Sequence, residues 1–251
     1  MRRQARWAVV ALLLLAACGG PPRRRSAALD TLRRGEPVTV VHVLAPGETL
    51  RDVASLYYGD PGRAADLAAA AGLAPGAVPP AGTRLRLTLT PEQWQRARAL
   101  GAADAAYNAG VAALDRGDLP AAAAAFREAL ALDPRHVDAR YNLALVLLRR
   151  GRYEQAAAAL ARVLAARPGD RDARLALAGC RFHQARFADA IDRYRSLLRE
   201  NPRDADAAYG LARSLAAAGR RREARRAWRA FLALEPDGPR AAVARRELAG
   251  R

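Results

Sequence analysis

Few residues of this sequence combine the types and the spacing that chemistry requires. The three histidines, His42, His136 and His183, lie far apart, and no two of them have the short spacing of metal ligands on one helix. Glu48 and Asp52 are one helical turn apart, but glycoside hydrolysis needs two carboxylates that face one substrate across a cleft. Side chains at the start of one short helix fit a capping role better. The sequence therefore predicts no catalytic residue, no metal site and no cofactor.

Cys18 is the residue whose context indicates a covalent modification. Three arginines within residues 1–7 precede an apolar run, Ala8–Ala17, that is too short to span a bilayer, as in a targeting segment. The run ends Leu-Ala-Ala-Cys and is followed by Gly19. This ending resembles the lipobox of bacterial lipoproteins. The resemblance implies that residues 1–17 are a signal peptide and that Cys18 carries a diacylglyceryl thioether, which anchors the chain to a membrane facing the periplasm. The outer membrane is favoured because Gly19 is not aspartate. An ordinary signal peptide that contains a cysteine is the alternative.

The second cysteine, Cys180, has no disulfide partner if Cys18 carries lipid. It lies between Leu177 and Phe182 in a helical pattern. The position predicts a small buried or half-buried side chain rather than a reactive thiol.

The chain is strongly basic, with 42 Lys and Arg against 25 Asp and Glu and a formal net charge of +17. Every basic residue is an arginine, and arginines occur in all the expected helices. Without a nucleic-acid-binding motif, this diffuse charge predicts anionic lipid head groups or cell-wall polymers as neighbours, and no nucleic acid. Residues 18–37 contain Pro-Pro and three successive arginines, which is typical of a flexible tether.

Residues 38–89 form a small module by pattern. The pattern predicts a strand, two helices and a second strand, at 38–43, 50–57, 63–71 and 83–89. The order of the motifs Gly-Glu-Thr-Leu, Tyr-Tyr-Gly-Asp and Gly-Thr-x-Leu resembles the LysM module, which binds peptidoglycan and chitin. The resemblance implies that N-acetylglucosamine units lie between the loop after the first strand and the loop before the second. The implied glycan-binding residues are Pro46, Gly47, Glu48, Thr49, Leu50, Ala74, Pro75, Gly76 and Val78. Helix capping by Glu48 and Thr49 is a further reading, compatible with binding.

Residues 103–238 consist of four similar blocks of 34 residues each: 103–136, 137–170, 171–204 and 205–238. Pro134, Pro168, Pro202 and Pro236 end successive blocks, and each block pairs two helical patterns around a turn. This period and these residues resemble the tetratricopeptide repeat (TPR) family. Residues 90–102 are expected to form a linking helix, which Gly101 could interrupt, and residues 239–251 a capping helix.

In that family the first helix of each repeat lines a concave face. Carried over by position, the implied groove is mostly apolar and suits a hydrophobic or amphipathic segment of a periplasmic protein or peptide. About half of the lining is expected to be inter-repeat core instead. The implied residues are Tyr107, Asn108, Val111, Tyr141, Asn142, Leu145, Leu175, Phe182, Tyr209 and Arg213.

The sequence thus predicts a mainly α protein, in which a small βααβ LysM module precedes a TPR α-solenoid of four repeats and a capping helix. The favoured function is a non-catalytic envelope lipoprotein that binds peptidoglycan and scaffolds a partner protein. Two alternatives use the same architecture: a regulator that recruits a cell-wall hydrolase or synthase, and a secretion or motility assembly factor whose LysM module has lost sugar binding.

Overall fold

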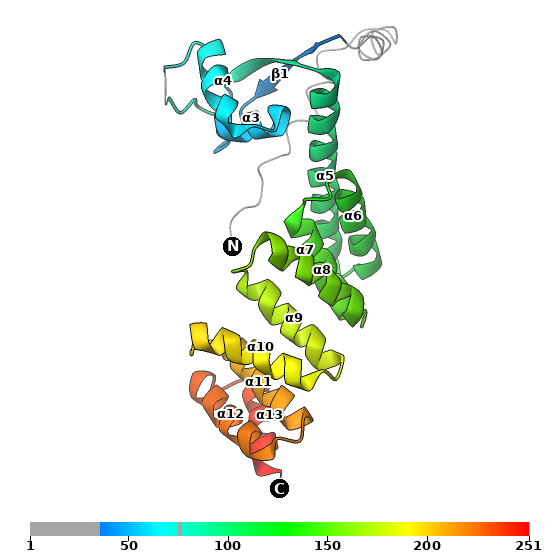
Figure 1. The fold of residues 1–251 in the computed structure, drawn as a ribbon, viewed down its shortest axis with the longest axis vertical. Coiled ribbons are helices and arrows are strands. Elements are labelled where there is room, and N and C mark those ends of the chain that lie inside the picture. Colours follow the sequence, from blue (N-terminus) through cyan, green and yellow to red (C-terminus); the bar gives the residue numbers. More distant parts are fainter. Residues whose placement is uncertain (1–35, 75–76, 251) are drawn as a thin grey trace. The chain divides into compact units, whose positions relative to one another are not determined.

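The structure, a computed structural model, describes residues 36–74 and 77–250. The predicted signal peptide, Cys18, nearly all of the tether and two of the predicted glycan-binding residues, Pro75 and Gly76, lie outside the described residues. The chain is mainly helical and divides into two compact units (Figure 1). The first unit comprises the chain up to Ala109 together with Glu128–Pro134, and the second comprises Gly110–Arg127 together with the chain from Arg135 onwards.

The first unit contains a two-stranded sheet and two short helices, in the predicted order. Its elements are β1 (Val38–Val43), α3 (Leu50–Tyr58), the 3₁₀ turn η1 (Pro61–Arg63), α4 (Ala64–Ala70) and β2 (Arg84–Leu89). The strands are antiparallel, with Val38 opposite Leu89 and Val43 opposite Arg84. Leu85, Leu87 and Leu89 are buried while the residues between them are exposed, as the alternating pattern requires. With α3 and α4 they enclose a core that also includes Ala97.

The expected linking helix does not end at residue 102. Helix α5 runs without a break from Pro91 to Asp115 and merges with the first helix of the first repeat. It begins at a capping box, in which the Gln93 N–H donates to Thr90 Oγ1 at 3.3 Å and the Thr90 N–H to Gln93 Oε1 at 2.9 Å. The possible break at Gly101 does not occur, because one glycine among alanines and leucines costs about 1 kcal/mol, too little to end a helix.

The second unit is an array of helix pairs that follow the 34-residue blocks. Helices α5 and α6 (Leu119–Leu132) each lie partly in both units. The remaining helices pack each against the next: α7 (Val137–Arg149), α8 (Tyr153–Ala166), α9 (Arg171–His183), α10 (Phe187–Glu200), α11 (Ala205–Ala217), α12 (Arg221–Leu234) and α13 (Pro239–Ala249). Helix α13 covers the last pair, in the place of the expected capping helix.

In the second, third and fourth pairs, the start of the first helix is capped at the same repeat position. The side chains of His136, Asp170 and Asp204 accept the backbone N–H of the residue three further on, at 3.2, 2.9 and 3.0 Å. Such caps satisfy a backbone donor that a helix start leaves unpaired. This spacing of caps fixes where each pair begins.

The turns inside the pairs depend on a left-handed residue. Gly117, Gly151 and Gly219 have φ between 71° and 75°, and Ala185 occupies the same repeat position with φ 55°. The hydrogen bonds around Ala185 match those of the glycine turns, with the Arg186 N–H donating to the Arg181 carbonyl at 2.9 Å. The array thus imposes a glycine conformation on an alanine, whose Cβ makes that conformation unfavourable.

Replacing Ala185 by glycine is therefore expected to stabilise the second unit. Ala185→Gly should raise the free energy of unfolding by about 1 kcal/mol, because it removes the Cβ strain. Gly151→Ala is the matched control and should lower it by a similar amount. Chemical denaturation followed by circular dichroism measures both changes, and a destabilised Ala185→Gly variant would contradict the assignment of strain.

Candidate functional site

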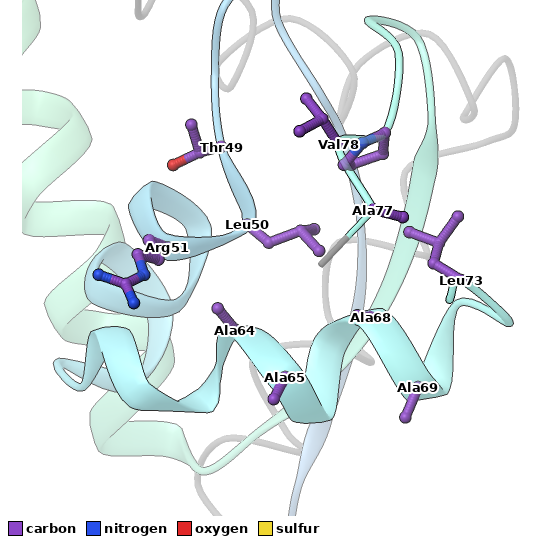
Figure 2. A pocket seen from close by; sticks show the side chains of 11 residues that line it. Thr49, Leu50, Arg51, Ala64, Ala65, Ala68, Ala69, Leu73, Ala77 and Val78 are labelled. Carbon is purple, nitrogen blue, oxygen red and sulfur yellow. The ribbon is translucent and has the colours of Figure 1, made fainter. Parts of the chain in front are cut away.

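The described part of the first unit contains an open groove with a volume of about 420 Å³. Its lining comes from the start of α3, from one side of α4 and from the loop that leads to β2 (Figure 2). The lining residues are Thr49, Leu50, Arg51, Ala64, Ala65, Ala68, Ala69, Leu73, Ala77, Val78 and Pro79. Most of these side chains are small or apolar. The groove can therefore accept a ligand with flat apolar faces, whose polar groups reach the backbone of the two loops.

Three of the predicted glycan-binding residues, Thr49, Leu50 and Val78, line this groove. Leu50 is only 7% exposed, whereas Val78 is 87% exposed. Pro46 and Gly47 form an exposed turn just before them, and Ala74 is exposed but does not line the groove. The sequence reasoning missed the contribution of α4, although alanines at positions 64, 65, 68 and 69 already marked one small-residue face of a helix.

Glu48 occupies a different place from the one expected. Its side chain is buried and faces away from the solvent into a polar cluster, so it does not line the groove. Glu48 Oε2 accepts the Ala45 N–H at 2.9 Å and lies 3.0 Å from His42 Nε2. Its predicted contact with a glycan therefore finds no support in this geometry. Its predicted cap role passes to Asp52, which forms a capping box with Thr49.

The polar cluster continues from His42 to Tyr57. A carboxylate only accepts hydrogen bonds, so His42 Nε2 must donate to it, and in a neutral ring Nδ1 then accepts from the Tyr57 hydroxyl at 3.2 Å. Burial, with a smaller contribution from the Glu48 charge, raises the pKa of Tyr57 to about 12. The cluster ties β1, the loop 44–49 and α3 together beside the groove.

Removing the Glu48 carboxylate should destabilise the first unit selectively. Glu48→Ala leaves His42 and the Ala45 N–H without their acceptor, at an expected cost of about 2–3 kcal/mol. Glu48→Gln keeps a carbonyl acceptor and should cost less than about 1 kcal/mol. Hydrogen exchange of the amides of α3 measures both changes within this unit. Equal effects of the two substitutions would show that the acceptor is not what matters.

The predicted partner-binding residues are all half-exposed or exposed, and none of them is buried. Tyr107 and Asn108 belong to the first unit, and the other eight belong to the second. The expectation that about half of them form inter-repeat core is met only in part, because none of the ten is fully buried. Leu175, Phe182 and Tyr209 do pack against core clusters, but each leaves part of its side chain at the surface.

Arg213 gives the second unit's surface a cationic centre. Its guanidinium carbon lies 4.5 Å from the centre of the Phe182 ring and 5.8 Å from that of Tyr209. Stacking on aromatic rings orients the guanidinium plane and leaves its N–H groups available at the edge. The surface can therefore offer apolar contacts and a positive charge to one ligand segment.

Ion pairs connect the first helices of successive repeats. Arg171 Nη2 donates to Asp204 at 2.6 Å and to Asp206 at 2.8 Å, and Asp206 also accepts from Arg240 Nη1 at 2.7 Å. These hydrogen bonds from Arg171 and Arg240 hold the pKa of Asp206 below its ordinary value. Arg240 in turn lies 5.5 Å from the Tyr209 ring centre, so the pairs also position the aromatic surface.

The stability of the second unit should fall in acid through Asp206. Because its pKa is lower in the folded than in the unfolded chain, its contribution is present above about pH 4 and is lost as the pH falls through the folded value. Asp206→Asn should therefore weaken the unit at pH 7 and flatten its stability curve below pH 4. Asp192→Asn, at an exposed position, is the control. Urea denaturation over a pH series distinguishes the two, and parallel curves for wild type and Asp206→Asn would refute the linkage.

Chemistry of other kinds finds little support in the described residues. No cluster of three or more potential metal ligands occurs among them. Cys180 is fully buried, and burial is the main cause that raises the pKa of its thiol to about 11, which disfavours the reactive thiolate. Over the same described ranges, every helix is too short or too polar to cross a bilayer.

Comparison with known proteins identifies the repeats. Two sequence profiles, both described as tetratricopeptide repeat, match the chain, one over residues 92–137, 107–171 and 141–205 and the other over residues 181–248. Among curated proteins, none matches this chain.

Solved structures share the fold. MamA from Desulfovibrio magneticus RS-1 is 19% identical, with 58% of this chain and 81% of that chain covered and a TM-score of 0.54. YrrB, described as a TPR protein with an unusual peptide-binding site, is 23% identical, with 62% and 81% covered and a TM-score of 0.55. A tetratricopeptide repeat protein from Parabacteroides merdae is 19% identical, with 59% of each chain covered and a TM-score of 0.52. At these identities the comparison concerns the fold alone.

Proposed function

We propose that the chain, which belongs to the tetratricopeptide repeat family over residues 92–248, is a non-catalytic lipoprotein of the bacterial cell envelope; the lipoprotein part rests on the Leu-Ala-Ala-Cys sequence that ends at Cys18. Its first unit would be a LysM module that binds the N-acetylglucosamine-containing glycan of peptidoglycan. Its repeats would hold a periplasmic partner protein. Lipid on Cys18 would keep it at a membrane, with the outer membrane favoured.

The observation that carries the glycan proposal is the groove beside Leu50 and Val78. The two loops in which the LysM resemblance places the glycan both contribute to one open groove of about 420 Å³. The lining of alanine, leucine, valine and proline suits the apolar faces of a sugar and its acetamido methyl group. The buried Glu48 carboxylate binds His42 and the Ala45 N–H and so holds the loop 44–49 in place. A loop that is ordered before binding lowers the entropy cost of binding a ligand in the groove.

The scaffold proposal depends on the half-exposed row of the second unit. Tyr141, Phe182 and Tyr209 belong to this row, and each leaves part of its aromatic ring at the surface, where it can contact a ligand. Such side chains favour the binding of an extended or helical segment. YrrB, which shares the fold, has a peptide-binding site according to its description.

Peptidoglycan binding should depend on Val78. The full chain carrying Cys18→Ser, so that no lipid attaches, is expected to co-sediment with purified sacculi at both low and high salt. Val78→Asp should weaken this binding about tenfold or more, because the carboxylate would be desolvated against an apolar ligand face. The side chain is 87% exposed, so the fold should tolerate the change.

Val41→Asp is the matched control, since Val41 is 45% exposed in the same unit and does not line the groove. It should leave sacculus binding unchanged. Binding that disappears with salt in every variant would assign it to the arginines alone. Absence of binding would exclude the wall-binding function and favour an assembly factor whose module has lost sugar affinity.

A further inference from the structure

Helix α12, the second helix of the last repeat, has an outer face made almost entirely of arginine. Seven of its residues are exposed: the alanines 230 and 233, and Arg221, Arg222, Arg225, Arg226 and Arg229. Trp228 and Phe231, both almost fully buried, fix the opposite side of the helix in the core. The five arginines, called here the α12 face, are therefore exposed on a helix whose other side is held in the core. Helix α12 lies near the end of the array (Figure 1).

The equivalent helices of the preceding repeats differ. Arg162 is the one exposed arginine of α8, which also exposes Glu154. Arg199 is the one exposed arginine of α10, beside the exposed carboxylates Asp192 and Glu200. A uniform preference for arginine across the chain would not produce this contrast. Arginines do occur in every helix from α5 to α13, as expected, but exposed arginines are concentrated on the second helix of the last repeat.

The positive charges of the α12 face are not neutralised by carboxylates of the described residues. None of its five arginines forms an ion pair with another residue in the described ranges, and the nearby Glu223 already pairs with Arg195 and Arg220. Arg221, Arg225 and Arg229 follow one another at four-residue spacing, and like charges at this spacing destabilise a helix by about 0.2–0.5 kcal/mol per pair. A role in solubility alone would be met equally well by carboxylates or by mixed charges.

We propose that the α12 face binds the phosphate groups of an anionic membrane surface. Guanidinium groups bind phosphate through two parallel N–H bonds, and several of them on one helix side can meet several head groups at once. The other exposed residues of α12 are the alanines 230 and 233, with no aromatic ring to stack on a base and no amide to read a base edge. This composition favours a lipid surface over nucleic acid.

The choice of a membrane rests on the proposed envelope location, but the surface is separate from the groove and from the half-exposed row. A lipid chain at Cys18 alone would give one attachment. A second, electrostatic attachment on the folded array would add to it, because two weak membrane signals together anchor far better than one.

The test is co-sedimentation of the full chain carrying Cys18→Ser with vesicles of phosphatidylcholine and phosphatidylglycerol in a 70:30 ratio, against phosphatidylcholine alone. The substitutions R221Q, R225Q and R229Q together should weaken binding to the anionic vesicles about tenfold or more. Lysine at the same three positions keeps the charge and should retain most of the binding. The control triple R127Q, R162Q and R203Q removes equal charge at exposed positions and should have a much smaller effect. Circular dichroism confirms that each variant is folded.

Equal losses in the two glutamine triples would overturn the proposal, because net charge and not the face would then be responsible. Unchanged binding in the first triple would overturn it as well. Tighter, face-dependent binding to duplex DNA than to the vesicles would reassign the face to nucleic acid. Sacculus binding of the α12 triple should stay at the wild-type level, so a failure here leaves the groove proposal intact and the reverse also holds.

Discussion

The structure of the second unit depends on one packing constraint: no helix pair of this size can bury its apolar face alone, so each must pack against its neighbour. The close contacts that achieve this pair a small residue with a large one. At Gly210, a Cβ atom would fall 2.4 Å from the Tyr194 ring, and at Gly110 it would fall 2.5 Å from Phe126. At these two contacts the tight approach leaves little room for another arrangement of the helices.

This constraint also explains why some side chains of the first helices remain at the surface. The bulky core residues Phe126, Leu160, Tyr194 and Trp228 all come from the second helix of a pair, and all are buried. They need small partners, which the alanine-rich first helices supply. The first helices therefore keep a side that contributes little to the core, and side chains such as Tyr141 and Arg213 can stay half-exposed or exposed there. Stability and the proposed recognition therefore depend on largely different residues of the repeats.

Most of the fold could be predicted from the sequence, because the repeat period and the alternating pattern of β2 are local signals. Local sequence patterns do not predict the structure correctly where a contact with a residue distant in the sequence determines it. The end of the expected linking helix at residue 102 was wrong because propagation through Gly101 is inexpensive. Glu48 looked like a helix cap or a ligand residue, and nothing in its neighbourhood shows that His42, on a strand, would pair with it. The α4 side of the groove was missed because alanines carry no functional group that indicates binding. They line a groove only because the loop before β2 lies opposite them.

Three features of the structure are locally unfavourable: the strained Ala185, the buried polar cluster and the α12 face. They have different implications for function. Ala185 has an unfavourable backbone conformation that glycine would adopt without strain. Its surroundings do not indicate a ligand, so we interpret this strain as one that the packing of the array tolerates. The buried cluster of His42, Glu48 and Tyr57 is costly to desolvate, but it lies directly behind a groove and orders one of its loops. The α12 face sets like charges side by side without internal partners, which a solvent-exposed helix has no structural reason to do. Of the three, only the last two lie beside a groove or form a charged face that a ligand could bind, and these two are therefore the sites where function is best sought.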